Sequence, residues 1–125
     1  RDFCLSRGLG DVYKRQDEDC ATAVSALSDY IVHVHAKDML VRSGMNFDPG
    51  KGYNLSRGGN YWRGTIFGHG NVPTFQILSA IRKSGYDGYV SLEFEGMEPV
   101  LEGVEIGTQN LQHMIEVIGE GQRYV

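Results

Sequence analysis

The sequence has 125 residues, the length of one domain, with 12 basic and 16 acidic side chains and a formal net charge of −4. This charge lacks the basic excess of a nucleic-acid-binding domain, and no apolar run reaches the roughly 18 residues that span a membrane. The first ten residues lack the apolar core of a signal peptide, and two cysteines do not make a disulfide framework. We therefore expect a soluble protein of the reducing cytoplasm. Glycine is unevenly spread, because eight of the 17 glycines lie between Gly44 and Gly70.

Residues 1–16 show neither a helical nor a strand period. Within them, SRGLGDVYKRQ (6–16) resembles the in-frame translation of a sequencing adapter, of a kind found at broken gene ends in metagenomic assemblies. We interpret 1–16 as a non-native, disordered segment and 17–125 as a partial domain; a genuine polar arm is the alternative. Without this segment, 109 residues remain, with eight basic and 14 acidic side chains and a net charge of −6.

The next part of the chain predicts a helix, a strand and a long loop. Apolar residues at helical spacing predict a helix over 17–27, with Cys20 as a buried apolar residue. β-Branched residues alternate with polar ones in Tyr30–Asp38 (YIVHVHAKD), which predicts a strand. Residues 39–71 are rich in glycine and aromatic residues. We expect a long functional loop there, because disordered segments are poor in aromatic residues.

The last part predicts a helix, a second strand, a loop and a final helix. The first helix follows Pro73 and ends at Gly85. A strand is predicted at Tyr89–Glu95 (YVSLEFE), followed by a loop over 96–107 and a helix with Thr108 as its N-cap and Gly119 at its end. The alternation of strands and helices predicts an α/β fold with parallel strands.

Side chains alternate between the two faces of a strand, and both predicted strands have one apolar and one polar face. The polar faces carry His33, His35 and Lys37 in the first strand, and Ser91, Glu93 and Glu95 in the second. Parallel α/β folds place their sites at the carboxyl ends of strands, and burying these groups without partners is costly. We therefore predict that the His, Lys and Glu side chains surround a metal ion and a polar substrate. Two edge strands with one solvated face are the alternative.

Three segments in this order resemble the C-terminal part of one family: IVHVHAKD (31–38), RGGNYWRGTIFGHGNVP (57–73) and GYDGYVSLEFEG (85–96). This is the sugar phosphate isomerase/epimerase family of xylose isomerase-like TIM barrels, and the resemblance covers 17–118. It implies the C-terminal part of a (β/α)8 barrel, incomplete in this chain. The family's earlier strands would precede residue 17.

The resemblance also implies one divalent metal ion (Mn²⁺, Mg²⁺, Co²⁺ or Zn²⁺) at the carboxyl ends of the strands. His35 and Glu93 match the family's metal-binding His and last metal-binding Glu, and Glu93 is also the expected catalytic residue. The family's other Glu and Asp ligands lie on earlier strands. The expected substrate-binding or supporting residues are His33, Lys37, Arg57, Trp62, Arg63, His69 and Glu95. For the loop residues and Glu95, an ordinary surface or packing role is the alternative.

The implied reaction is isomerisation or epimerisation of a sugar or sugar phosphate through an enediolate, with the metal as Lewis acid and two carboxylates as acid and base. A lyase or hydratase acting on keto-sugars or glycosides with the same metal site is the first alternative, and a non-enzymatic carbohydrate-binding barrel is the second. The acidic net charge and the few histidines argue against an endonuclease that acts on abasic DNA with three zinc ions. We expect no nucleic-acid or membrane partner, and a homo-oligomer of the full-length protein stays open. The chain alone is expected to be inactive and prone to aggregation, because part of a barrel leaves open sheet edges.

Overall fold

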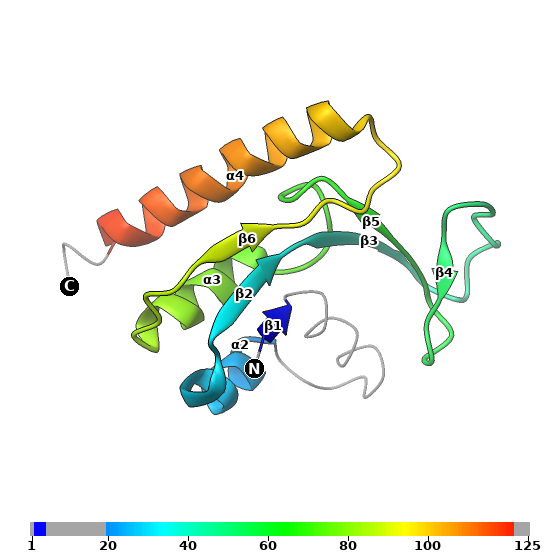
Figure 1. The fold of residues 1–125 in the computed structure, drawn as a ribbon. Coiled ribbons are helices and arrows are strands. Elements are labelled where there is room, and N and C mark those ends of the chain that lie inside the picture. Colours follow the sequence, from blue (N-terminus) through cyan, green and yellow to red (C-terminus); the bar gives the residue numbers. More distant parts are fainter. Residues whose placement is uncertain (1, 5–19, 122–125) are drawn as a thin grey trace.

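The structure, a computed structural model, describes residues 2–4 and 20–121 (Figure 1). Its parallel sheet has the strand order β1–β2–β6, with β1 at Asp2–Cys4, β2 at His33–Ala36 and β6 at Val90–Leu92. The helices are α2 (Cys20–Leu27), which continues into the 3-10 turn η1 (Ser28–Tyr30), α3 (Thr74–Lys83) and α4 (Val100–Gly121). The parallel pairing of β2 with β6, and the helix between them in the chain, confirm the predicted α/β order.

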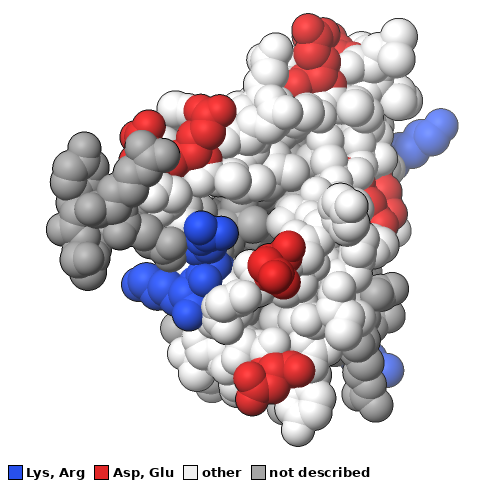
Figure 2. Space-filling model, turned by 60° about the vertical axis from the view of Figure 1, so that its left-hand side comes forward, with Lys and Arg blue, Asp and Glu red and all other residues white. Residues whose placement is uncertain are grey.

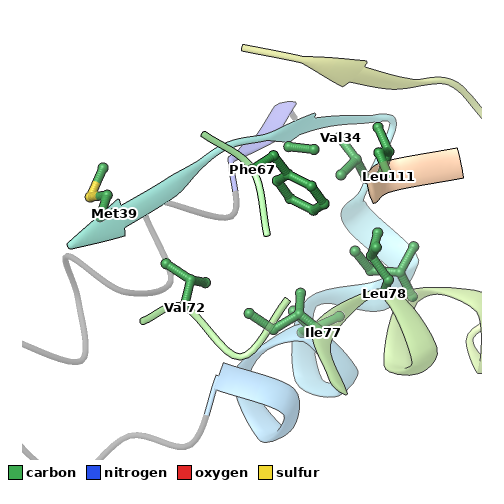
Figure 3. Packing of buried hydrophobic residues seen from close by; sticks show 10 residues of the cluster. Val34, Met39, Phe67, Val72, Ile77, Leu78 and Leu111 are labelled. Atoms are coloured by element: carbon green, nitrogen blue, oxygen red, sulfur yellow. The ribbon is translucent and has the colours of Figure 1, made fainter. Parts of the chain in front are cut away.

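The core lies between β2 and the three helices. Val34 and Ala36, on the predicted apolar face of β2, are fully buried. They share one cluster with residues of α2, α3 and α4, namely Val24, Ile77, Leu78, Ile81 and Leu111. In Figure 3, the ring of Phe67 points between Val34 and the side chains of α3. Each fully buried apolar side chain stabilises the fold by about 1.5–3 kcal/mol, so this packing fixes β2 and leaves its other face for polar groups.

Helix α3 begins and ends close to the predicted residues. Pro73 is its N-cap and Thr74 its first residue. Gly85 lies just beyond the C-cap with a φ of 84°, and its N–H donates to the Arg82 carbonyl oxygen at 3.1 Å. A positive φ strains residues that have a Cβ atom, so glycine suits this position.

The long loop predicted over 39–71 is wrong, because these residues form most of a second sheet. Its strands have the order β3–β5–β4, with antiparallel pairing, and are β3 (Asp38–Arg42), β4 (Asn54–Leu55) and β5 (Tyr61–Thr65). In Figure 1 this sheet extends beyond the end of β2. These strands are short and separated by glycine-rich turns. Apolar and polar residues therefore do not alternate over enough consecutive positions to predict a strand, so the strands were missed.

The loop predicted over 96–107 is also wrong in part, because α4 begins at Val100 and ends at Gly121. Thr108 is not an N-cap; its hydroxyl donates to the Val104 carbonyl oxygen, one turn earlier in the same helix, at 2.7 Å. Gly103 and Gly107, which indicated a loop, are buried in the helix. A Cβ atom on Gly103 would lie 2.7 Å from the Phe94 ring, so close packing explains a glycine within the helix.

The prediction of disorder does not hold for Asp2–Cys4, which form β1 and pair in parallel with β2. The unpaired backbone N–H and C=O groups at the edge of a strand accept any extended segment, whatever its side-chain pattern. The rest of the expected adapter segment, 5–16, lies outside the described residues, as does the predicted start of the first helix at 17–19. The interpretation of 1–16 as non-native stays a prediction, and the predicted burial of Cys20 also falls outside what is described.

The charged side chains visible in Figure 2 form small groups. On the face shown in Figure 2, acidic and basic groups lie apart among uncharged residues, and the described part of this face has no continuous basic stripe. None of the helices among residues 20–121 combines the length and the apolar character needed to cross a membrane.

Candidate functional site

The polar faces of β2 and β6 meet in a ladder of three side-chain pairs. In each pair the two residues are 58 positions apart, because the two strands are parallel and keep one register. The pairs are His33 with Ser91, His35 with Glu93, and Lys37 with Glu95. The structure thus brings together five of the predicted site residues, and it adds Ser91.

Glu93 lies at the centre of this ladder, and each of its carboxylate oxygens has its own partner. Oε1 is hydrogen-bonded to His35 Nδ1, and Oε2 lies 2.9 Å from Lys37 Nζ. The backbone N–H of Glu93 donates to the Ala36 carbonyl oxygen at 2.9 Å, which fixes its position beside β2. The side chain keeps 33% of its surface exposed. The hydrogen bonds from His35 and then Lys37 outweigh partial burial and hold the pKa of the Glu93 carboxyl below its ordinary value.

His33 supports the same group from the amino-terminal side. Its Nε2 is 2.9 Å from Ser91 Oγ, and its ring packs edge-on against the His35 ring, with centroids 4.8 Å apart. Ser91 was missed as a functional residue. Its place on the polar face of the second strand was the available signal, but serine alone indicates no particular chemistry.

The His35–Glu93 pair fits part of a site for a divalent ion. Nδ1 and Oε1 face one another, and an imidazole nitrogen and a carboxylate oxygen are both ligands of Zn²⁺ and related ions. Within residues 2–4 and 20–121, however, no group of three or more His, Cys, Asp and Glu side chains is placed to hold a metal. A complete site therefore needs donors other than these two.

Arg63 lies at a second polar cluster, beside the loop after β6. Its Nη1 donates to the Gly64 carbonyl oxygen at 3.1 Å and to Glu98 Oε1 at 3.3 Å, and the Thr65 hydroxyl donates to the same Glu98 oxygen at 2.8 Å. The other Glu98 oxygen, Oε2, is buried without a partner among the described groups. Burial raises the pKa of Glu98, but its own backbone N–H, Thr65 and Arg63 together hold that pKa below its ordinary value. Glu98 was missed because it falls in a segment predicted as a loop.

Arg63 also lies over the ring of Tyr53, with the guanidinium carbon 5.8 Å from the ring centroid. Burial raises the pKa of the Tyr53 phenol, but Arg42 and Arg63 outweigh it and lower that pKa overall. The geometry therefore gives Arg63 structural partners on two sides.

The other three predicted loop residues lie apart from the ladder. Arg57 is exposed in the turn between β4 and β5, and His69 is exposed in the turn after β5. Trp62 is partly buried against the hydrophobic core. Within the described part of the chain, no hydrogen bond or ion pair joins these three side chains to Glu93.

Asp38, the first residue of β3, braces a turn. It is 2% exposed, and its carboxylate accepts four backbone N–H groups. The donors are Met39 at 2.8 Å, Gly68 at 3.0 Å, Gly70 at 2.9 Å and Val72 at 3.2 Å. These bonds hold the turn after β5 against the carboxyl end of β2.

A family model described as a xylose isomerase-like TIM barrel matches residues 9–118 of the chain. No curated protein matches the chain.

Proposed function

Since the chain belongs to the xylose isomerase-like TIM barrel family, whose members are generally sugar-processing enzymes, we propose that it carries part of the active site of a sugar or sugar phosphate isomerase or epimerase. The observation that supports this most is the ladder between β2 and β6, in which Glu93 is held by His35 and Lys37 yet stays one-third exposed.

Such a reaction removes a proton from the carbon next to a carbonyl and returns a proton to the neighbouring position or to the opposite face of the same carbon. A glutamate carboxyl is already ionised at neutral pH, which is the form that accepts a proton, and the lowered pKa of Glu93 is consistent with that form. Its exposure gives substrate access to it. Return of the proton from the opposite face requires a second acid, which would come from outside the ladder.

We also propose that His35 and Glu93 contribute two ligands to a site for one divalent metal ion, with the remaining ligands from residues outside those described. When bound, such an ion supplies Lewis acid stabilisation of the negative charge that develops on the substrate oxygens. On this proposal Glu93 has two roles, as in the sequence-based expectation. Weaker binding of Mn²⁺ by H35A and E93Q than by H69A, measured by calorimetry, would support the shared site.

The proposal is tested by assaying a panel of ketoses, aldoses and their phosphates with the full-length protein, called the wild type below, and with its E93Q and E95Q variants. We expect E93Q to lower kcat at least about 100-fold, since amides are not bases at neutral pH. E95Q is the matched comparison, because Glu95 lies on the same face but is 61% exposed and is joined to Glu93 through Lys37, so we expect a much smaller loss. Full activity of E93Q would overturn the proposal. Formation of an unsaturated product from a keto-sugar would instead identify a lyase that uses the same residues.

A further inference from the structure

Lys37 occupies an unusual position for a residue expected to contact substrate. Its side chain is only 16% exposed, and its ammonium group lies between two carboxylates. Nζ is 2.9 Å from Glu93 Oε2 and 3.3 Å from Glu95 Oε1. An ammonium group has three N–H donors. The two contacts use one donor each, for a hydrogen bond to each of the two carboxylates.

The two contacts differ, and the difference indicates which carboxylate depends on Lys37 for its position. Glu93 is one-third exposed and is bonded on its other side by His35, whereas Glu95 is mostly exposed and its contact with Lys37 is longer. An exposed ion pair contributes little, while a partly buried one is screened less by solvent. Glu95 therefore acts as a support for the ammonium group, and Glu93 is the group whose position depends on it.

Without Lys37, the Glu93 carboxylate would keep His35 as its only side-chain partner within the ladder. Rotation about the terminal torsion of a glutamate is broad, so a single hydrogen bond leaves the carboxylate plane poorly fixed. A second bond to the other oxygen removes that freedom. The same ammonium charge also reduces the repulsion between Glu93 and Glu95, which point to the same side of β6.

We propose that Lys37 is a positioning residue: it fixes the carboxylate plane of Glu93, with Glu95 as its second anchor, and is not a substrate-binding residue. The importance of this role for catalysis rests on the proposed function of Glu93. The geometric part does not, because it concerns the protein without any ligand.

The test measures the His35 ring directly. Long-range ¹H–¹⁵N spectra of the imidazole nitrogens are recorded without substrate and in EDTA for the wild type, K37M, K37Q, K37R and E95Q. If Lys37 fixes Glu93, K37M shifts or broadens the His35 Nδ1 signal, because its partner carboxylate moves. E95Q gives a smaller change. K37R, which keeps the charge, restores a signal closer to the wild type. K37Q keeps an uncharged N–H donor group and serves as the second variant if K37M fails to fold, as judged from amide spectra.

A His35 signal in folded K37M or K37Q that is identical to the wild type would overturn the proposal. Kinetics provide the second readout. A positioning role predicts a fall in kcat of about 10- to 100-fold with KM nearly unchanged, because a displaced catalytic group slows the chemical step. A rise in KM alone would instead make Lys37 a substrate-binding residue. An inactive wild type, or an E93Q variant with full activity, would overturn the proposed function but leave the spectroscopic result to decide the role of Lys37.

Discussion

Two carboxylates near the carboxyl end of β2 have contrasting surroundings. Asp38 is 2% exposed and accepts four backbone N–H groups, so its capacity to accept hydrogen bonds is filled by the fold. Glu93 is bonded by two side chains and stays one-third exposed. A carboxylate whose partners are all backbone groups of one turn can only hold that turn. A carboxylate held by side chains at a partly open face keeps a path for substrate. On the function proposed for Glu93, this contrast separates a structural acid from a reactive one.

The largest expected effect comes from His35, the predicted metal ligand, and it is compared with His69, which was predicted to bind substrate. H35A removes the partner of Glu93 Oε1, and we expect kcat to fall at least about 100-fold. H69A removes an exposed turn side chain with no contact to the ladder and should change kcat less than about threefold. An equal loss of kcat in H35A and H69A would show that the ladder residues are no more important for activity than the turn residue His69.

Replacement of Asp38, in contrast, should lower the stability of the fold without a direct effect on catalysis. D38A leaves buried backbone N–H groups without their acceptor, and we expect the free energy of unfolding to fall by about 3–5 kcal/mol in urea titrations. The control is D48N, because Asp48 lies in an exposed loop and accepts one backbone N–H, from Gly50. A loss below about 1 kcal/mol in D38A would contradict a bracing role.

The packing of α4 against β6 gives a smaller effect. G103A places a methyl group 2.7 Å from the Phe94 ring, and overpacking of this kind costs about 1–3 kcal/mol. G119A is the control, because a Cβ atom there meets nothing within 4 Å, and alanine favours a helix by about 1 kcal/mol over glycine. Thermal unfolding should therefore move in opposite directions for the two variants. A stabilising G103A would mean that α4 packs differently from the structure.

The smallest effect concerns pH. Because the pKa of Glu98 is lowered in the folded protein, its ionised form adds stability above its ordinary pKa of 4.5. That contribution is lost as the pH falls below 4.5 and through the lower folded value. E98Q should therefore lose less stability than the wild type between about pH 5 and pH 3. Parallel stability curves for the two proteins over this range would contradict the lowered pKa.

The sequence predicted the parts of this molecule in which the pattern repeats over enough residues. The alternation over 30–38 and 89–95 predicted the burial of Val34 and Ala36 and the polar faces of both parallel strands. The strands themselves are shorter than predicted, at His33–Ala36 and Val90–Leu92, and Val32 lies outside β2 and is 65% exposed. Gly85 ended α3 as expected. The family resemblance, which the match over 9–118 confirms, added the barrel fold that these few elements alone do not specify.

The missed features have a common physical cause, since glycine serves several roles that look alike in a sequence. Gly103 and Gly107 allow close packing in a helix, whereas Gly50, Gly52 and Gly59 lie between the short strands β3, β4 and β5 and have a positive φ. Ser91 and Glu98 were missed because their roles depend on partners 58 and 33 residues away. Partners at such distances become visible only when the strand register is known.

The central claim, that Glu93 is the group that moves the substrate proton, is tested most directly by exchange with solvent. The substrate found in the panel is incubated in D₂O with the wild type, E93Q or E95Q, and deuterium at the carbon next to the carbonyl is followed by ¹H NMR. The account predicts exchange with the wild type and E95Q and loss of exchange by at least about 100-fold with E93Q. Exchange with E93Q at the wild-type rate would contradict it.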